Sequence, residues 1–264
     1  ASGQYNTSVG YEALTGFTTA GESTAIGYLA GNDITTGVRN VTVGAYSGDA
    51  LTTGARNVAI GSNSLSAATT ADINIAIGQS AMESAAASVA FTECIAIGKD
   101  TLTAVNSTDV NGTVAIGHQA GTSITSGQQS TLVGYLAGHN LTTADYNTAL
   151  GYKALGGANT STNITGNNNV AIGTMAMADA YDNCASNVAV GNQSLEEITN
   201  GKYNTAVGAY SGDNVTTGEG NTYLGYYALP SAVDITDEIL IKAGTGTSMT
   251  GGGTETVRIG VQTD

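Results

Sequence analysis

This chain has few basic residues, cysteines and prolines, and it has no tryptophan. Its 264 residues include seven Lys and Arg, two Cys and one Pro, and the formal net charge is −14. Nucleic-acid binding needs clustered positive charge, and here the basic residues occur singly, so the composition excludes a nucleic-acid partner. An anionic membrane surface would repel the chain for the same reason. The sequence has no run of 18 apolar residues, which excludes a membrane-spanning helix.

The N-terminus and the cysteines add two further limits. No signal peptide is visible at Ala1, and the chain opens inside a repeat, at Tyr5 to Gly10. Repeat arrays need capping elements, so we expect either a fragment or a preceding domain or subunit. Cys94 and Cys184 lie about five repeats apart, on the order of 24 Å at ~4.8 Å per turn, whereas bridged Cα atoms lie within ~7 Å. We therefore predict two free, buried thiols that pack as small apolar residues.

Glycine is abundant, with 37 residues, and it recurs at a nearly constant interval. Eight of the twelve steps between equivalent glycines are 17 residues long, and the others are 20, 19, 22 and 18. A fixed period of this size is typical of a solenoid, in which each repeat forms one turn stacked on the next. Positions are numbered below from this anchor glycine as zero. The thirteen anchors are Gly10, Gly27, Gly44, Gly61, Gly78, Gly98, Gly117, Gly134, Gly151, Gly173, Gly191, Gly208 and Gly225.

The residues before each anchor predict a short β-strand. Position −1 is Ile, Val or Leu and position −3 is Thr, Val or Ile in all thirteen repeats, while position −2 is Ala in nine. β-Branched residues that alternate with a small residue are typical of a strand, and a helix would place them on opposite sides. We predict that the β-branched residues are buried inside the solenoid. The alanine column would then face a closely approaching neighbour chain.

Two further positions predict how each turn is filled. Position −4 is Asn in nine repeats, and amides stacked at one place in successive turns predict a hydrogen-bonded ladder. Position +4 is Leu or Met in eight repeats and Gly in five. Each repeat with Gly at +4 has an aliphatic residue three positions later, so we predict one apolar plug per turn, supplied from +4 or from +7. The plugs at +7 are Ile34, Leu51, Ile124, Leu141 and Val215. Thr-Thr pairs such as Thr35-Thr36 come next, and they predict a second short strand or a turn that closes the repeat.

The thinness of each turn favours an oligomer. Seventeen residues enclose little core for the surface they expose. Together with the alanine column, this predicts a wound assembly, and we expect closed symmetry with three chains, a homotrimer. Twelve steps at ~4.8 Å would give a shaft of roughly 58 Å.

The repeat pattern ends near Leu229, which divides the chain in two. We predict a β-solenoid repeat shaft over residues 1-229 and a C-terminal β cap, or the start of the next fibre module, over residues 230-264. Pro230 donates no ladder hydrogen bond and suits the end of a sheet. Strands are expected at 238–242 and 256–261. Insertions at 85–93, 105–111 and 156–168 are either exposed recognition loops or neutral changes at tolerant turns.

Several repeat units resemble those of a known family. Asn57-Val58-Ala59-Ile60-Gly61 and the matching unit at 169–173 resemble the head repeat of YadA-like trimeric adhesins. The longer unit at 204–213 resembles repeats of bacteriophage tail fibres, and Arg258-Ile259-Gly260 resembles a segment that follows such repeats. The resemblance covers about residues 4 to 229. It implies a left-handed parallel β-roll with three chains around one axis, on a virion or cell surface. It also implies more fibre, or a chaperone domain, after Asp264.

The sequence contains no convincing catalytic or metal site. His118 and His139 are the only histidines, and we interpret them as surface turn residues because zinc needs three or four ligands. No serine lies in a glycine elbow with a partner base. The acidic residues are not expected to form a ladder, and adjacent Glu196 and Glu197 would point to opposite faces of a strand. We predict no enzyme activity, no catalytic residue, no metal and no cofactor, and we assign no receptor-binding residue.

Acidic and aromatic residues near the turns have two interpretations each. Asp33, Asp49 and Asp213 stand just after a turn glycine, and we interpret them as turn residues rather than calcium ligands. Tyrosines cluster at positions +1 and +2, as in Tyr28 and Tyr46. They would cover the edge of a turn or line the subunit contact, and stacking on sugars is the alternative.

The pattern as a whole predicts a structural, adhesive fibre segment, with a phage tail fibre as the first expectation. Its place would be the virion tail or an extracellular surface. Its partners would be fibre or virion proteins at the ends and a cell-surface receptor or glycan. A bacterial trimeric adhesin or an extracellular filament subunit is the alternative. An ice-binding solenoid and a polysaccharide-cleaving spike are disfavoured, because adjacent threonines face opposite ways and carboxylate pairs are lacking.

Overall fold

The protein is an all-β, parallel β-solenoid of about 14 turns with a spacing of about 17 residues, as the glycine period predicts. The structure is a computed structural model that describes residues 3–85, 89–156, 163–181, 183–244 and 249–261. Two compact units, Ala1–Ser130 and Thr131–Asp264, divide the chain. Each unit is a stack of turns with one strand of the main sheet per turn.

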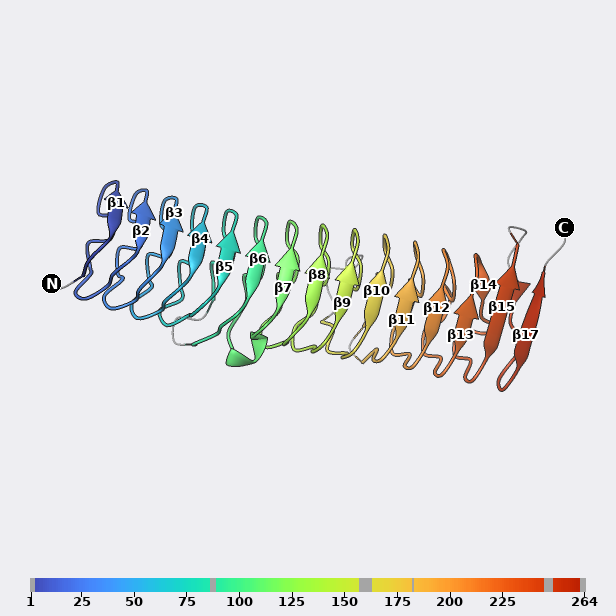
Figure 1. The fold of residues 1–264 in the computed structure, drawn as a ribbon. Helices are drawn as coiled ribbons and strands as arrows, with labels where there is room; N and C mark the ends of the chain where they lie inside the picture. The colour runs from blue at the N-terminus through green and yellow to red at the C-terminus, as the bar shows by residue number, and fades with distance from the viewer. Residues whose placement is uncertain (1–2, 86–88, 157–162, 182, 245–248, 262–264) are drawn as a thin grey trace. The chain divides into compact units, whose positions relative to one another are not determined.

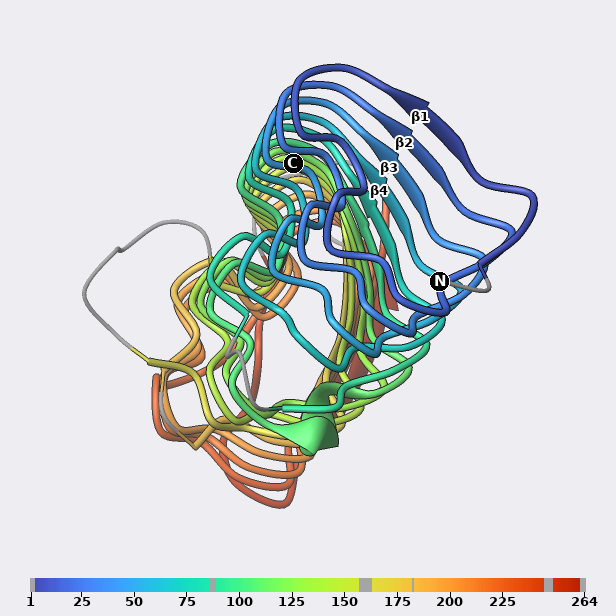
Figure 2. The ribbon, with the colours of Figure 1, turned by 90° about the vertical axis from the view of Figure 1, so that its left-hand side faces the viewer.

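The first unit builds its sheet from three-residue strands that pair in parallel with the next strand along the chain (Figure 1). The register is constant, so that Ala59 lies opposite Ala76 and Ile60 opposite Ile77. Turns β1 to β4 follow closely similar paths in Figure 2. The strands are β1 (Thr7–Val9), β2 (Thr24–Ile26), β3 (Val41–Val43), β4 (Val58–Ile60), β5 (Ile75–Ile77), β6 (Ile95–Ile97) and β7 (Val114–Ile116).

The second unit repeats this arrangement. Its main strands are β8 (Thr131–Val133), β9 (Thr148–Leu150), β10 (Val170–Ile172), β11 (Val188–Val190), β12 (Thr205–Val207), β13 (Thr222–Leu224), β15 (Ile239–Ala243) and β17 (Val257–Val261). β15 and β17 lie where strands were predicted, and they continue the parallel sheet from β13. A separate parallel pair joins β14 (Ala228–Leu229) to β16 (Met249–Thr250).

The anchor glycine is required for two independent reasons. Gly61 has φ of +130°, a backbone conformation that side chains with a Cβ rarely adopt. A Cβ placed on Gly61 would also lie 2.5 Å from the carbonyl oxygen of Gly78 in the next turn. Real Cβ atoms do not approach backbone oxygen so closely, so the stacking distance itself demands glycine.

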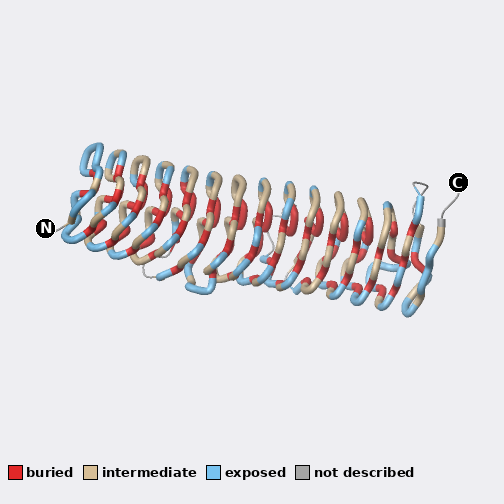
Figure 3. The backbone as a smooth tube through the Cα atoms, in the orientation of Figure 1, coloured by how far each residue is buried: buried red, intermediate tan, exposed pale blue. Residues whose placement is uncertain are grey.

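The orientation of the strands is the reverse of the prediction. The small residue at position −2 points into the solenoid, and Ala59, Ala76, Ala149 and Ala171 are fully buried. Positions −3 and −1 point outward and are partly or fully exposed, as in β4, where only the central residue is buried. Figure 3 shows the buried residues recurring at the same places in successive turns of a unit. Alternation with period two places the two residue types on opposite faces without specifying which face is inside.

One apolar side chain fills the interior of each turn, as predicted. It comes from the wall opposite the strand. Position +4 has a left-handed backbone in twelve turns, for example φ of +51° at Leu65 and +56° at Gly48. In seven of the eight Leu and Met turns that side chain is buried, Leu229 being partly exposed, and in Gly turns the residue at +7 is buried instead. A Cβ on Gly138 would lie 2.8 Å from Cδ1 of Leu141, so the two positions compete for one space. The Thr-Thr pairs lie in bends of the backbone and not in a second strand, and these bends close each repeat.

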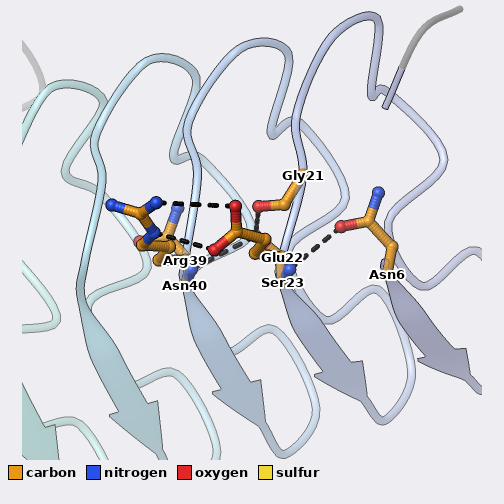
Figure 4. Close-up of polar contacts among 6 residues, drawn as sticks. All are labelled: Asn6, Gly21, Glu22, Ser23, Arg39 and Asn40. Atoms are coloured by element: carbon orange, nitrogen blue, oxygen red, sulfur yellow. Dashed lines mark hydrogen bonds and ion pairs between the residues drawn. The ribbon is translucent and has the colours of Figure 1, made fainter. Parts of the chain in front are cut away.

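The asparagine column forms the predicted ladder. Asn57 Nδ2 donates to Asn40 Oδ1 (3.1 Å) and to the carbonyl oxygen of Ala71 (2.7 Å). Its Oδ1 accepts from the backbone N–H of Asn74 (3.0 Å). Where serine replaces asparagine, the hydroxyl takes over one role, because Ser23 Oγ accepts from the backbone N–H of Asn40 (Figure 4). All of these side chains are buried, so each turn is tied to the next inside the solenoid.

The insertions are only partly described. The one at 105–111 contains a short 3₁₀ helix, η1 (Thr108–Val110), whose start is capped by Ser107. Val110 turns inward and is buried. Residues 86–88 and 157–162 of the other two insertions lie outside the described residues.

Candidate interaction surface

The outward face of the sheet, made of positions −3 and −1, is the most unusual surface of the protein. It presents Val, Ile, Leu and Thr side chains in every turn, and Ile26, Leu150 and Val207 are 40 %, 47 % and 40 % exposed. The two outward positions of a strand are about 7 Å apart and neighbouring strands about 4.8 Å apart, so each unit carries a long, narrow apolar stripe. Contiguous exposed apolar surface of this kind marks an interaction site.

Charge is excluded from this face. Among the described strands, no outward position holds Asp, Glu, Lys or Arg, although the chain has a net charge of −14. The charges lie in the turns, where Arg39 Nε pairs with Glu22 Oε2 at 2.9 Å in the neighbouring turn (Figure 4). An uncharged stripe lets two strongly anionic chains approach each other without bringing like charges together.

Exposed tyrosines form short stacks at the carboxyl ends of the strands. The rings of Tyr11 and Tyr28 lie 5.4 Å apart and nearly parallel, and those of Tyr135 and Tyr152 lie 5.5 Å apart. In the second unit, Tyr210 stacks on Tyr227 at 4.6 Å. These contacts follow from the turn spacing, because tyrosines at equivalent positions are one strand separation apart. The stacks support the predicted role of covering the edges of the turns.

The structure corrects the prediction that acidic residues form no ladder. Asp179, Glu196 and Asp213 lie in successive turns of the second unit, where the backbone N–H of Asp179 donates to the carbonyl oxygen of Glu196 and that of Glu197 to Asp213. Glu196 and Glu197 belong to a turn and not to a strand. Burial, and then the charges of Glu196 and Glu197, raise the pKa of Asp213 to about 6. Burial also raises the pKa of Glu196 and of Asp179.

We expect this acidic ladder to make the second unit more stable in mild acid. A carboxyl group whose pKa is raised by folding stabilises the fold most below its unfolded pKa, near 3.9, and this contribution is lost as the pH rises through about 6. For half-buried Asp213 the contribution is of order 1 kcal/mol after allowing for solvent screening. The measurement is thermal unfolding at pH 5 and pH 7.5 for the wild type and Asp213→Asn. Equal pH effects in the two proteins would contradict the prediction.

The remaining candidate residues occupy structural positions. Asp49 lies in a reverse turn outside the strands, as interpreted from the sequence, and burial raises the pKa of its carboxyl group. His118 and His139 lie in turns of different units and are partly exposed. Across the described ranges, no three His, Cys, Asp or Glu side chains gather as metal ligands would.

Both cysteines are free and buried, as predicted. Cys94 takes an asparagine position in the ladder, where its backbone N–H donates to Asn74 Oδ1. Burial raises the thiol pKa to about 11 for Cys94 and about 12 for Cys184. Both thiols are therefore protonated at neutral pH and inert as nucleophiles.

Two buried polar residues near the C-terminal end were missed from the sequence. Glu238 lies 17 residues after Asn221 and takes the next ladder position, where its backbone N–H donates to Asn221 Oδ1. Its carboxyl group accepts from the hydroxyl of Tyr223 (3.2 Å) and from the backbone N–H of Gly253 (2.9 Å). Lys242 Nζ donates to the carbonyl oxygen of Tyr226 and lies over the Tyr226 ring. Continuing the 17-residue count past Leu229 would have found both positions.

Comparison with protein-family models and with curated proteins finds no match to this chain. The described part of the chain has no helix with the length and apolar character needed to cross a membrane.

Proposed function

We propose that this chain is a structural and adhesive fibre segment, of the kind found in phage tail fibres, in which three copies bury their outward faces against one another. The observation that carries the proposal is the uncharged, exposed stripe of β-branched side chains on each unit. A second copy is the natural partner, because it alone has the same turn spacing along its surface. The stripe is narrow, which suits convergence of several copies on an axis better than a broad two-sheet sandwich.

The contacts between successive turns support a role as a stiff structural element. Backbone hydrogen bonds and an apolar plug recur from turn to turn, and a buried amide ladder joins the turns that have asparagine at −4, so most turns are held by the same contacts as their neighbours. Such a segment would stand on a virion tail or an extracellular surface and hold a receptor-binding part away from it. The proposal gives the chain no catalytic role and no cofactor.

The test is the solution mass by light scattering, measured before and after gentle heating. We expect three times 26.3 kDa, kept until cooperative unfolding. A stable, folded monomer of 26.3 kDa would overturn the proposal, because the outward face would then be exposed in solution.

A further inference from the structure

The outward face is not uniform, because threonine replaces valine or isoleucine at position −3 in some strands. These strands occur as adjacent pairs, β1–β2 in the first unit and β8–β9 and β12–β13 in the second. The paired strands bring their threonines side by side, as in Thr131 opposite Thr148 and Thr205 opposite Thr222. We call these pairs the threonine bands; their members are Thr7, Thr24, Thr131, Thr148, Thr205 and Thr222.

The band threonines point to the outside, away from the interior of the solenoid. Thr7 and Thr131 are exposed and the other four are partly exposed. No hydrogen bond of these six hydroxyl groups is found among the described residues. A threonine hydroxyl that becomes buried against hydrocarbon loses its water without gaining a partner, which costs free energy.

A second, independent pattern marks the same strands. Five of the six band strands are followed by tyrosine directly after the anchor glycine, and none of the strands with Val or Ile at −3 in β3–β7 and β10–β11 is. The sixth, β12, has Tyr210 one position later, a position that also holds Tyr46 after β3, so the pattern marks five of the six band strands. The bands are therefore composite features in which hydroxyl groups lie at both ends of a strand, and chance substitution of Val by the isosteric Thr does not account for them.

We infer that the threonine bands set the axial register of the three copies. This inference rests on the proposed trimer. A stripe of identical apolar turns would bind equally well after sliding by one turn, because every turn presents the same surface. The bands remove this degeneracy, since each hydroxyl finds its own counterparts in neighbouring copies only when the copies are level. A single buried polar residue sets register in coiled coils by the same means.

The order of strands in the second unit shows how a slip would be penalised. From β8 to β17 the residues at −3 read Thr, Thr, Val, Val, Thr, Thr, Ile, Val. A slip of one turn places Thr148 against Val170, Val188 against Thr205 and Thr222 against Ile239. Three hydroxyl groups per contact would then face hydrocarbon, whereas a level arrangement leaves none in that position.

The most direct test moves one threonine band to other strands. It measures whether chains with threonines at the same positions assemble with one another in preference to chains with a different arrangement. The swapped chain carries Thr131→Val, Thr148→Val, Val170→Thr and Val188→Thr, which keeps its composition and side-chain shapes. Wild-type and swapped chains with different tags are unfolded together, refolded, and separated by tag. Random mixing gives about three quarters mixed trimers, and we expect under about a tenth.

The outcomes separate this inference from the proposed trimer. Mixed trimers at about three quarters would overturn the register role while leaving the trimer intact. A swapped chain that is monomeric on its own would also count against it, because its pattern is self-consistent. A monomeric wild type would overturn the trimer itself and the register role with it.

A second measurement avoids moving the band. All six band threonines are replaced by valine, and a spin label is placed at the exposed turn residue Glu197 through Glu197→Cys. We expect one distance between labels in the otherwise unchanged chain and several distances in the valine variant, from copies displaced by about 4.8 Å per turn. A control with Val41, Val58, Val170 and Val188 changed to isoleucine keeps one distance. One distance in the valine variant as well would overturn the inference.

Discussion

Replacing Ile77 and Ile97 together by lysine is expected to convert the proposed trimer to single chains. Both side chains lie at position −1 on the outward face of adjacent strands, and they are partly exposed in the isolated chain. Burying the added ammonium groups at a shared axis costs several kcal/mol per ion, with like charges facing one another. Light scattering should show the mass falling from three times 26.3 kDa to 26.3 kDa.

The control is a pair of lysines, with the same added charge, in other parts of the same two turns. Ser84→Lys and Asn106→Lys lie at exposed positions after β5 and β6, outside the strands, and should leave the mass at three chains. Circular dichroism should show that the Ile77→Lys and Ile97→Lys protein keeps its β-structure, because neither side chain belongs to the interior. If the doubly substituted protein remained trimeric, the outward face would not be the subunit contact.

Replacing Asn57 by leucine is expected to lower the free energy of unfolding by about 2–6 kcal/mol. The substitution leaves the backbone N–H of Asn74 and the carbonyl oxygen of Ala71 without partners in a fully buried site. It also breaks the amide chain between Asn40 and Asn74. Each buried group without a partner costs about 1–3 kcal/mol, which gives the size of the effect. Urea unfolding followed by circular dichroism measures it.

Asn57→Ser is the matched control, because serine already stands in the ladder at position 23. Ser23 Oγ accepts from the backbone N–H of Asn40, so a serine at 57 can serve the N–H of Asn74 in the same way. The decrease in unfolding free energy for Asn57→Ser should be about half that for Asn57→Leu, since only the carbonyl oxygen of Ala71 is left without a partner. Equal losses for the two variants would show that packing volume, and not the hydrogen bonds, accounts for the effect.

The features that recur in every turn were predictable because each depends on local geometry. The spacing of glycines such as Gly61 and Gly78 sets the length of a turn, and the positive φ at these anchors admits no other residue without strain. The ladder follows from amides at one place in successive turns, as in Asn40 and Asn57. The choice between +4 and +7 for the apolar plug follows from their shared space, as Gly138 and Leu141 show.

The acidic ladder was missed because its members are offset within their turns. Asp179 stands six residues after its anchor glycine, whereas Glu196 and Asp213 stand five after theirs. Counting from the anchor therefore places the first in a different column from the other two. The hydrogen bond from the N–H of Asp179 to the carbonyl oxygen of Glu196 joins position +6 to position +5 of the next turn, as the bond from Glu197 to Asp213 does. The offset therefore remains, and the three carboxyl groups are neighbours in successive turns without sharing one column.

The sequence by itself determined the period, the strand in each turn, the internal ladder and the number of apolar plugs. It left open which side of the strand is inside, because alternation at −3, −2 and −1 is symmetric with respect to the two faces. Only closure of the turn decides this. The plug at +4 or +7 fills the interior from the opposite wall, and the space left beside it accepts alanine, as at Ala59 and Ala76. Isoleucine and valine are therefore placed outside, where another chain can cover them.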